Sequence, residues 1–252
     1  MINRIRTILA ILTIAIMVIL FLPIIGICYI VRIFDSKTAG RIAQFLMRLI
    51  FKAVIAISGA HIDVLGYDNV PDCPVLYTAN HRGMFDIVVA YAIIKKPLSF
   101  VAKIQLQKVP VLHAWMKLMN GLFLDRDDIR QGLKTILAAA LNISKGISVW
   151  IFPEGTRIKN CPETEMIPFK QGSFKIAAKS ECPVIPVAMY GIRDVFDEDV
   201  FILKPGHIVV SFLPPVYPDK LSEEDSRHIA PYVQNIILEE LKRITENEKA
   251  TS

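Results

Sequence analysis

Apolar residues cluster first at the start of the chain. Thr7 to Val31 is a run dominated by Ile and Leu that contains no charged side chain and is interrupted by Pro23 and Gly26. As a helix, this run would extend about 37 Å, enough to cross a bilayer core of about 30 Å. The run predicts a retained membrane anchor, in a spanning or a re-entrant form, because no small-x-small cleavage site of a signal peptide follows it.

A helical period of polar and apolar positions follows between Lys37 and Ile57. Spacings of three and four residues place five polar or basic side chains on an arc narrower than about 90°, with apolar side chains on the rest of the helix. The pattern predicts a helix in the membrane interface with its cations toward anionic head groups. A buried helix with a solvated basic stripe is the alternative. The stripe consists of Lys37, Arg41, Gln44, Arg48 and Lys52.

From His61 onward, short apolar runs alternate with helical stretches, which is typical of an α/β fold. Helices are expected over 132–144 and 173–179, and a long closing helix over 222–247. We expect one domain over 59–252, with a mostly β-sheet core flanked by helices, preceded by a membrane-associated two-helix segment over 1–58. The expected strands are Ile62 to Leu65, Val75 to Thr78, Leu98 to Ala102, Leu122 to Leu124, Ser148 to Phe152, Val184 to Met189 and Ile208 to Phe212.

Composition and charge divide the chain in the same place. With 53% hydrophobic and 21% charged residues, the chain is too apolar to remain disordered. The first 60 residues carry seven basic residues and one acid, whereas the rest carries 22 basic and 23 acidic residues, so no nucleic-acid-binding face is expected. The basic residues after the apolar run place the body on the cytoplasmic side of a membrane. The four cysteines show neither disulfide nor metal-ligand spacing, so no metal is expected.

The first candidate for chemistry follows the strand expected at 75–78, in the segment N-H-R-G-M-F-D over 80–86. A histidine at a strand end, here His81, can act as a base oriented by a carboxylate five residues later, here Asp86. Gly83 would let the chain turn back between them. Alternatively, Asp86 is the N-cap of a helix over 87–94 and His81 is an ordinary turn residue.

Three further segments place charged groups on turns. F-P-E-G-T-R over 152–157 combines an acid, a hydroxyl and a guanidinium after an expected strand. The segment 121–126 ends on an Asp-Arg pair, and 169–173 opens a helix whose amides, with Lys170, suit an anion. Each alone is also explained as a solvated turn or ion pair. The sequence contains no G-x-S-x-G, P-loop, G-x-G-x-x-G or H-E-x-x-H pattern.

Together, in order and spacing, these segments resemble the four motifs of the 1-acylglycerol-3-phosphate acyltransferase family. The resemblance covers about Val75 to Ile192, and the second motif departs from the common pattern by having Leu124 where Ile is usual. The matching pieces are Asn80-His81-x4-Asp86, Gly121-x2-Leu124-Asp125-Arg126, Phe152-Pro153-Glu154-Gly155-Thr156-Arg157 and Val184-Ile185-Pro186-Val187.

The resemblance implies that His81 is a general base, oriented by Asp86, that removes the proton of the acceptor hydroxyl as this attacks an acyl thioester. Backbone amides after His81 or near Gly155 could donate to the developing oxyanion. Pro186 is expected to shape the acyl pocket or the core. Lys103 and Lys170 are further candidates for phosphate or donor contacts. The second and third motifs imply glycerol phosphate binding by Arg126, Glu154, Gly155, Thr156 and Arg157.

The function that the resemblance implies is transfer of an acyl group from acyl-CoA or acyl carrier protein to the sn-2 hydroxyl of 1-acyl-sn-glycerol-3-phosphate, giving phosphatidic acid. The donor is a co-substrate, and no cofactor is expected. Membrane lipid, including anionic head groups, is the expected partner, with no nucleic acid and no obligate protein partner. Two alternatives stay open: an acyltransferase for another lysophospholipid or a lyso-amino-lipid, and a non-catalytic membrane lipid-binding protein.

Overall fold

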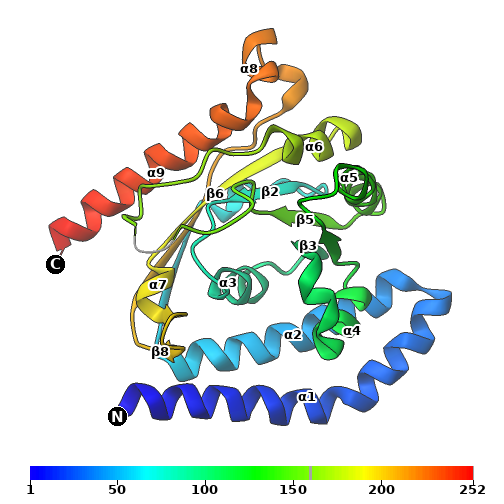
Figure 1. Cartoon of the computed structure of the whole chain (residues 1–252), viewed down its shortest axis with the longest axis vertical. Coiled ribbons are helices and arrows are strands. Elements are labelled where there is room, and N and C mark those ends of the chain that lie inside the picture. Colours follow the sequence, from blue (N-terminus) through cyan, green and yellow to red (C-terminus); the bar gives the residue numbers. More distant parts are fainter. Residues whose placement is uncertain (159–160, 252) are drawn as a thin grey trace.

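A computed structural model of the chain describes residues 1–158 and 161–251. A seven-stranded sheet runs through its centre in the order β1-β9-β6-β2-β5-β3-β4 (Figure 1). A separate hairpin pairs β7 with β8. The strands are β1 His61–Leu65, β2 Leu76–Ala79, β3 Leu98–Lys103, β4 Leu122–Leu124, β5 Ser148–Ile151, β6 Val184–Tyr190, β7 Phe196–Asp197, β8 Ile202–Leu203 and β9 His207–Phe212.

Helices occupy most of the remaining chain. Short 3-10 turns follow four of the strands: η1 Tyr67–Asn69, η2 Ile104–Lys108, η3 Gln171–Phe174 and η4 Pro218–Lys220. The α-helices are α1 Ile2–Phe34, α2 Ser36–Ser58, α3 Phe85–Ile93, α4 Pro110–Leu118, α5 Ile129–Ser144, α6 Lys175–Ser180, α7 Ile192–Val195, α8 Glu223–Arg227 and α9 Ile229–Thr251.

The sheet is mostly parallel, with one change of direction. β2 pairs in parallel with β5 and β6, and β3 pairs in parallel with β5 and β4, so these five strands end at one edge of the sheet. β9 is antiparallel to β6 and parallel to β1. The predicted α/β class is confirmed, and the seven predicted strands are all formed to within one residue at each end. The β7–β8 hairpin was not predicted.

Helices cover both faces of the sheet. α2, α3 and α4 pack on one face, and α5, α6 and α9 pack on the other (Figure 1). Successive side chains of a strand point to opposite faces of the sheet. In β2, Tyr77 therefore packs in the core under α2, α3 and α4, and Leu76 packs in the core under α5, α6 and α9; both are fully buried. A strand covered on both sides carries few polar side chains, which explains why Thr78 is the one polar residue of β2.

Two helix predictions need adjustment. The helix expected over 222–247 is two helices, α8 and α9, because His228 adopts φ −115° and ψ 34°, outside the α-helical region. Ser222 does cap the first of them, since its hydroxyl accepts the N–H of Asp225 at 3.1 Å. The helix expected over 173–179 begins as the 3-10 turn η3 and continues as α6.

α1 is one continuous helix that lies beside α2 along the body (Figure 1). The helix continues through Pro23, where the sequence allowed a re-entrant turn. Near its start the Thr7 hydroxyl accepts the N–H of Leu203 at 2.9 Å, and near its end the Tyr29 hydroxyl donates to the carbonyl of Ala114 at 2.9 Å. Within the described residues, α1 is the one helix long and apolar enough to cross a membrane, and only 11% of its most apolar window is buried.

α2 is amphipathic as predicted, but part of its polar stripe faces the protein. Gln44 is buried, donates to the carbonyl of Lys96 at 2.8 Å and accepts the N–H of Leu98 at 2.9 Å. Arg48 is half-buried and donates to the carbonyls of Tyr91 and Ile94. The expectation that these two side chains face lipid head groups is therefore wrong, because they satisfy carbonyls at and beyond the end of α3.

The other cations of the stripe, Lys37, Arg41 and Lys52, are exposed. That they face anionic lipid head groups stays a prediction. The division of the chain at residue 58 also stays a prediction. The opposite face of α2, with Leu46, Ile50 and Val54, belongs to the same hydrophobic core as the sheet.

Candidate active site

The loops that carry the predicted site leave the sheet at a single edge. β2 and β5 are adjacent parallel strands, with Thr78 opposite Ile151, so the loops that begin at Asn80 and Phe152 emerge side by side. β3 and β4 continue the same parallel group and end at Lys103 and Leu124. The sheet direction thus gathers groups that are far apart in the sequence, as is usual at the carboxyl edge of α/β sheets.

His81 and Asp86 form a close pair at this edge. The His81 Nδ1 atom lies 2.7 Å from the Oδ2 atom of Asp86, which is fully buried. The same oxygen accepts the backbone N–H of Arg82 at 2.8 Å and of Gly83 at 3.0 Å. Backbone N–H groups of the loop between His81 and Asp86 therefore hold the carboxylate in the position in which it contacts the His81 ring. The alternative role of Asp86 as a helix N-cap is wrong, because α3 begins at Phe85 and its N-cap is Met84.

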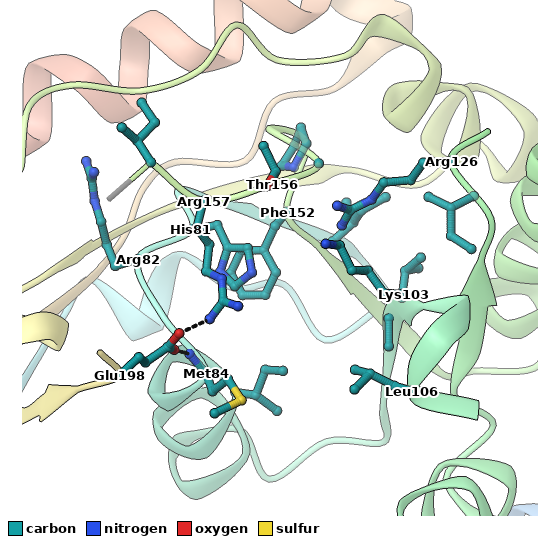
Figure 2. Close-up of a pocket in the computed structure, with 18 of the residues that line it drawn as sticks. His81, Arg82, Met84, Lys103, Leu106, Arg126, Phe152, Thr156, Arg157 and Glu198 are labelled. Atoms are coloured by element: carbon teal, nitrogen blue, oxygen red, sulfur yellow. Dashed lines mark hydrogen bonds and ion pairs between the residues drawn. The ribbon is translucent and has the colours of Figure 1, made fainter. Parts of the chain in front are cut away.

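The His81 ring is also fixed from the side. It stacks on Phe152 with ring centroids 4.1 Å apart and an interplanar angle of 13°. Because Nδ1 faces Asp86, Nε2 is the ring nitrogen that can act on a bound substrate. His81 lines a cavity of about 490 Å³ between the loops (Figure 2).

Glu154 joins the loops after β2 and β5. It is 1% exposed and buried behind the cavity wall. Its Oε1 atom accepts the backbone N–H of His81 at 2.7 Å, and its Oε2 atom accepts that of Ile167 at 2.9 Å. Burial raises the pKa of this carboxyl, whereas the two N–H groups and nearby positive charge oppose the rise. The carboxylate therefore positions the backbone of His81.

Among the described residues, six lysines and arginines line the cavity: Arg82, Lys103, Arg126, Arg157, Lys170 and Arg193. Figure 2 shows Arg126 and Lys103 on the side of the cavity opposite Arg82, with His81 between them. Burial lowers the pKa of the Arg126 guanidinium, and the nearby positive charge of Arg157 lowers it further. Arginine stays protonated despite such shifts, so two charged guanidinium groups lie close together, and a bound anion would stabilise this arrangement.

The Lys170 side chain passes close beside Gly155. Gly155 has φ +75°, and a Cβ atom built on it would lie 3.0 Å from both Cε and Nζ of Lys170. The backbone N–H of Lys170 donates to the carbonyl of Pro153 at 3.0 Å. The turn of the third motif is therefore bound to the residue that precedes η3, and the Lys170 ammonium lies next to Gly155. Thr156 lines the same cavity.

Two further predictions concern Pro186 and the backbone amides that could stabilise an oxyanion. Pro186, in the fourth motif, is buried in β6 opposite Thr78, so its place is in the sheet core. The amides proposed as oxyanion donors are paired within the protein, because those of Arg82 and Gly83 donate to Asp86 and that of Gly155 donates to the carbonyl of Phe152.

Two acids that pair with motif residues, Glu198 and Glu163, were not predicted from the sequence. Glu198, from the β7–β8 hairpin, pairs with Arg157 and accepts the backbone N–H of Met84. Arg82 is 3% exposed and its Nε atom lies 3.2 Å from the Oε2 atom of Glu163. Burial raises the pKa of Glu163, and Arg82 opposes the rise. A basic residue directly after His81 was the one visible signal of the second pair.

Comparison with known proteins identifies relatives of this chain. A family model described as Acyltransferase matches residues 61–190, which is more than half of the chain. A Saccharomyces cerevisiae protein named 1-acyl-sn-glycerol-3-phosphate acyltransferase is 28% identical over 205 residues, which cover 81% of this chain and 67% of that protein. A Borreliella burgdorferi protein of the same name is 26% identical over 205 residues, 81% of each chain.

The fold also matches a solved structure. The crystal structure of the 1-acyl-sn-glycerophosphate (LPA) acyltransferase PlsC from Thermotoga maritima superposes with a TM-score of 0.76, at 23% identity. The match covers 96% of this chain and 98% of that one. At this identity the likeness establishes a common fold, which includes the N-terminal helices as well as the sheet.

Proposed function

This chain belongs to the acyltransferase family, and on that basis we propose that it transfers a fatty acyl group from a thioester donor to the sn-2 hydroxyl of 1-acyl-sn-glycerol-3-phosphate, giving phosphatidic acid. The observation that carries the proposal is the His81–Asp86 pair, 2.7 Å apart, on the wall of a cavity rich in cations. The names of the yeast and Borreliella relatives support this choice of acceptor.

In the proposed reaction His81 is the general base. Its Nε2 atom takes the proton of the acceptor hydroxyl while the hydroxyl oxygen attacks the thioester carbonyl carbon. The new C–O bond forms, the C–S bond breaks, and the leaving thiolate takes the proton from the imidazolium. Asp86 keeps Nδ1 as the protonated nitrogen and stabilises the transient imidazolium charge. No covalent acyl-enzyme is needed, because the thioester is already activated.

The cations of the cavity would bind the acceptor's phosphate. Arg126 and Arg157 offer planar donor pairs that match a phosphomonoester, and Lys103 and Lys170 add point charges. Gly155 and Thr156 form part of the turn that carries Arg157, and both line the cavity. Glu154 is assigned as a positioning residue, since both of its carboxylate oxygens bond to backbone amides of the protein.

We also propose that the reaction takes place at a membrane, with the body on the cytoplasmic side. α1 exposes many large apolar side chains along its length, although its two ends are tied to the body. A helix in this arrangement can insert its outer face into one leaflet, so that a lysolipid enters sideways without full extraction into water. The basic residues that follow α1 favour the cytoplasmic surface.

Product analysis tests the proposal. Purified full-length protein in detergent is offered several lysolipids that differ in head group, each with acyl-CoA or with acyl carrier protein as donor. We expect phosphatidic acid to dominate, and His81→Ala to abolish its formation. A dominant product with another head group would replace the acceptor, and acyl transfer at the wild-type rate by His81→Ala would remove the base assignment.

A further inference from the structure

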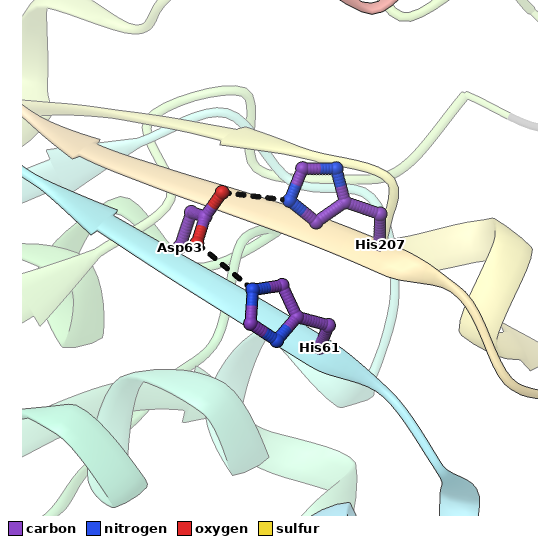
Figure 3. Close-up of side chains that lie close together, drawn as sticks. All are labelled: His61, Asp63 and His207. Carbon is purple, nitrogen blue, oxygen red and sulfur yellow. Dashed lines mark hydrogen bonds and ion pairs between the residues drawn. The ribbon is translucent and has the colours of Figure 1, made fainter. Parts of the chain in front are cut away.

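A second cluster of polar side chains lies at the edge of the sheet formed by β1 and β9. His61 and His207 are register partners in this parallel pair, and Asp63 lies two residues further along β1, on the same face as His61. The Nε2 atom of His61 is 3.1 Å from Oδ1 of Asp63, and the Nε2 atom of His207 is 2.9 Å from Oδ2 (Figure 3). One donor atom from each residue lies within 4.8 Å of the other two.

The two imidazole rings are already arranged to share one partner. They stack with centroids 5.6 Å apart and an interplanar angle of 26°, and both Nε2 atoms face the carboxylate between them (Figure 3). On the far side of its ring, the Nδ1 atom of His207 lies 2.9 Å from Oε2 of Glu248 in α9. A carboxylate on the second ring nitrogen is the usual partner of a metal-binding histidine, because it fixes the tautomer and orients the ring.

We propose that His61, Asp63 and His207 bind a divalent transition-metal ion, with Zn²⁺ as the best match, through two Nε2 atoms and one carboxylate oxygen. Two imidazoles and a carboxylate suit Zn²⁺, whereas Mg²⁺ and Ca²⁺ take oxygen ligands. With ligand bonds of about 2.1 Å, tetrahedral ligands lie about 3.4 Å apart. The two Nε2–carboxylate separations of 3.1 and 2.9 Å would widen by a few tenths of an ångström, and the ligand atoms already lie within 4.8 Å of one another. A water molecule would complete the coordination.

The backbone of this histidine–aspartate cluster is held by the sheet, and the cluster is accessible to solvent. The β1–β9 ladder holds all three residues, and the His61 side chain is 76% exposed, which gives an ion direct entry from solvent. Bound metal would link the edge strand β1 to β9 and, through Glu248, to α9. Because the cavity around His81 is lined by other residues, we expect the metal to raise thermal stability and to leave turnover unchanged.

Metal binding to the full-length protein tests the proposal. Tag-free protein carrying Cys73→Ser, which removes an exposed thiol that could compete, is stripped with a chelator and titrated with Zn²⁺ by calorimetry and with Co²⁺ by absorption spectroscopy. We expect one ion per chain, a tetrahedral Co²⁺ spectrum and a higher melting temperature with Zn²⁺. His61→Gln should abolish all three effects, and Glu248→Gln should weaken binding about 10- to 100-fold.

The matched control is His228→Gln, which removes an exposed histidine between α8 and α9 and should bind Zn²⁺ as the parent does. Because His61 is largely exposed, His61→Gln should keep the parent's melting temperature in the absence of metal, which separates loss of the site from loss of fold. Absence of stoichiometric binding by the parent, or unchanged binding by His61→Gln, would overturn the proposal.

Discussion

Glu198 forms an ion pair with Arg157, although the acid comes from the β7–β8 hairpin and the base from the turn after β5 (Figure 2). The other oxygen of Glu198 accepts the backbone N–H of Met84, at the start of α3. The hairpin acid therefore contacts two groups beside His81 that an incoming phosphate could use. In the proposed reaction, the acceptor's phosphate must compete with this carboxylate for Arg157.

Replacing Glu198 tests this competition. Glu198→Gln removes the negative charge while its amide oxygen can still accept from Met84, so we expect KM for 1-acyl-sn-glycerol-3-phosphate to fall with kcat little changed. A partly exposed ion pair contributes about 0.2–1 kcal/mol, which corresponds to a decrease of at most about fivefold. The control is Glu223→Gln, which removes the acid of an exposed ion pair in α8. A rise in KM would instead mean that Glu198 holds Arg157 in its binding position.

Asp86→Asn tests the orientation of the base. The amide cannot stabilise the imidazolium, and it disturbs the bonds from Arg82 and Gly83. We expect kcat to fall about 10²- to 10⁴-fold, with His81→Ala falling in the same range and the double variant losing little more. Steady-state kinetics give these values, and circular dichroism checks the fold. Asp72→Asn, at an exposed position, serves as the control, and additive losses would contradict a shared role.

Gly155→Ala tests the contact between the third motif and Lys170. An L-residue at φ +75° costs about 1–2 kcal/mol, and the new methyl group would displace the Lys170 ammonium. We therefore expect a lower melting temperature and a higher KM for the phosphate-bearing acceptor. Gly172→Ala is the matched control, because a Cβ atom there meets no atom within 4 Å. Equal behaviour of the two variants would contradict the close approach of Lys170 to the turn at Gly155.

The strands and the motif loops could be predicted because their signals are local. The apolar run at Leu76 and Tyr77 and the His81-x4-Asp86 spacing each lie within a short stretch of chain. The parallel order of the strands then brings the motif loops to one edge of the sheet. Glu198 could not be found in this way, because its partner Arg157 lies 41 residues away and the hairpin that carries it has strands of only two residues.

Side chains of α2 show a second limit of sequence patterns. Helical periodicity placed Gln44 and Arg48 on the same stripe as Lys37 and Lys52, and the stripe is real. Periodicity does not say which part of a polar stripe meets water or lipid and which part meets carbonyls at the end of another helix. Only the packing of α2 against α3 decides this, and it turns Gln44 and Arg48 inward.

The outer face of α1 provides the last prediction, on membrane binding. Ile16, Ile19 and Leu20 share one face of the helix and are 56%, 64% and 64% exposed, so replacing all three with Asn should leave the core intact. Full burial of such a side chain contributes about 1.5–3 kcal/mol, and 56–64% of each of the three remains to be buried. We therefore expect a total loss of at least about 3 kcal/mol, or at least about 100-fold weaker partitioning into vesicles.

The matched control replaces Leu133, Leu137 and Leu141 with Asn, since these α5 residues are 49%, 48% and 52% exposed and also lie on one helix face. Flotation with vesicles that contain anionic lipid measures binding of both triple variants, and acyl transfer to a long-chain acceptor in the same vesicles measures access. We expect only the α1 variant to lose both. Flotation of the α1 variant at the wild-type level would show that this face of the helix does not enter the membrane.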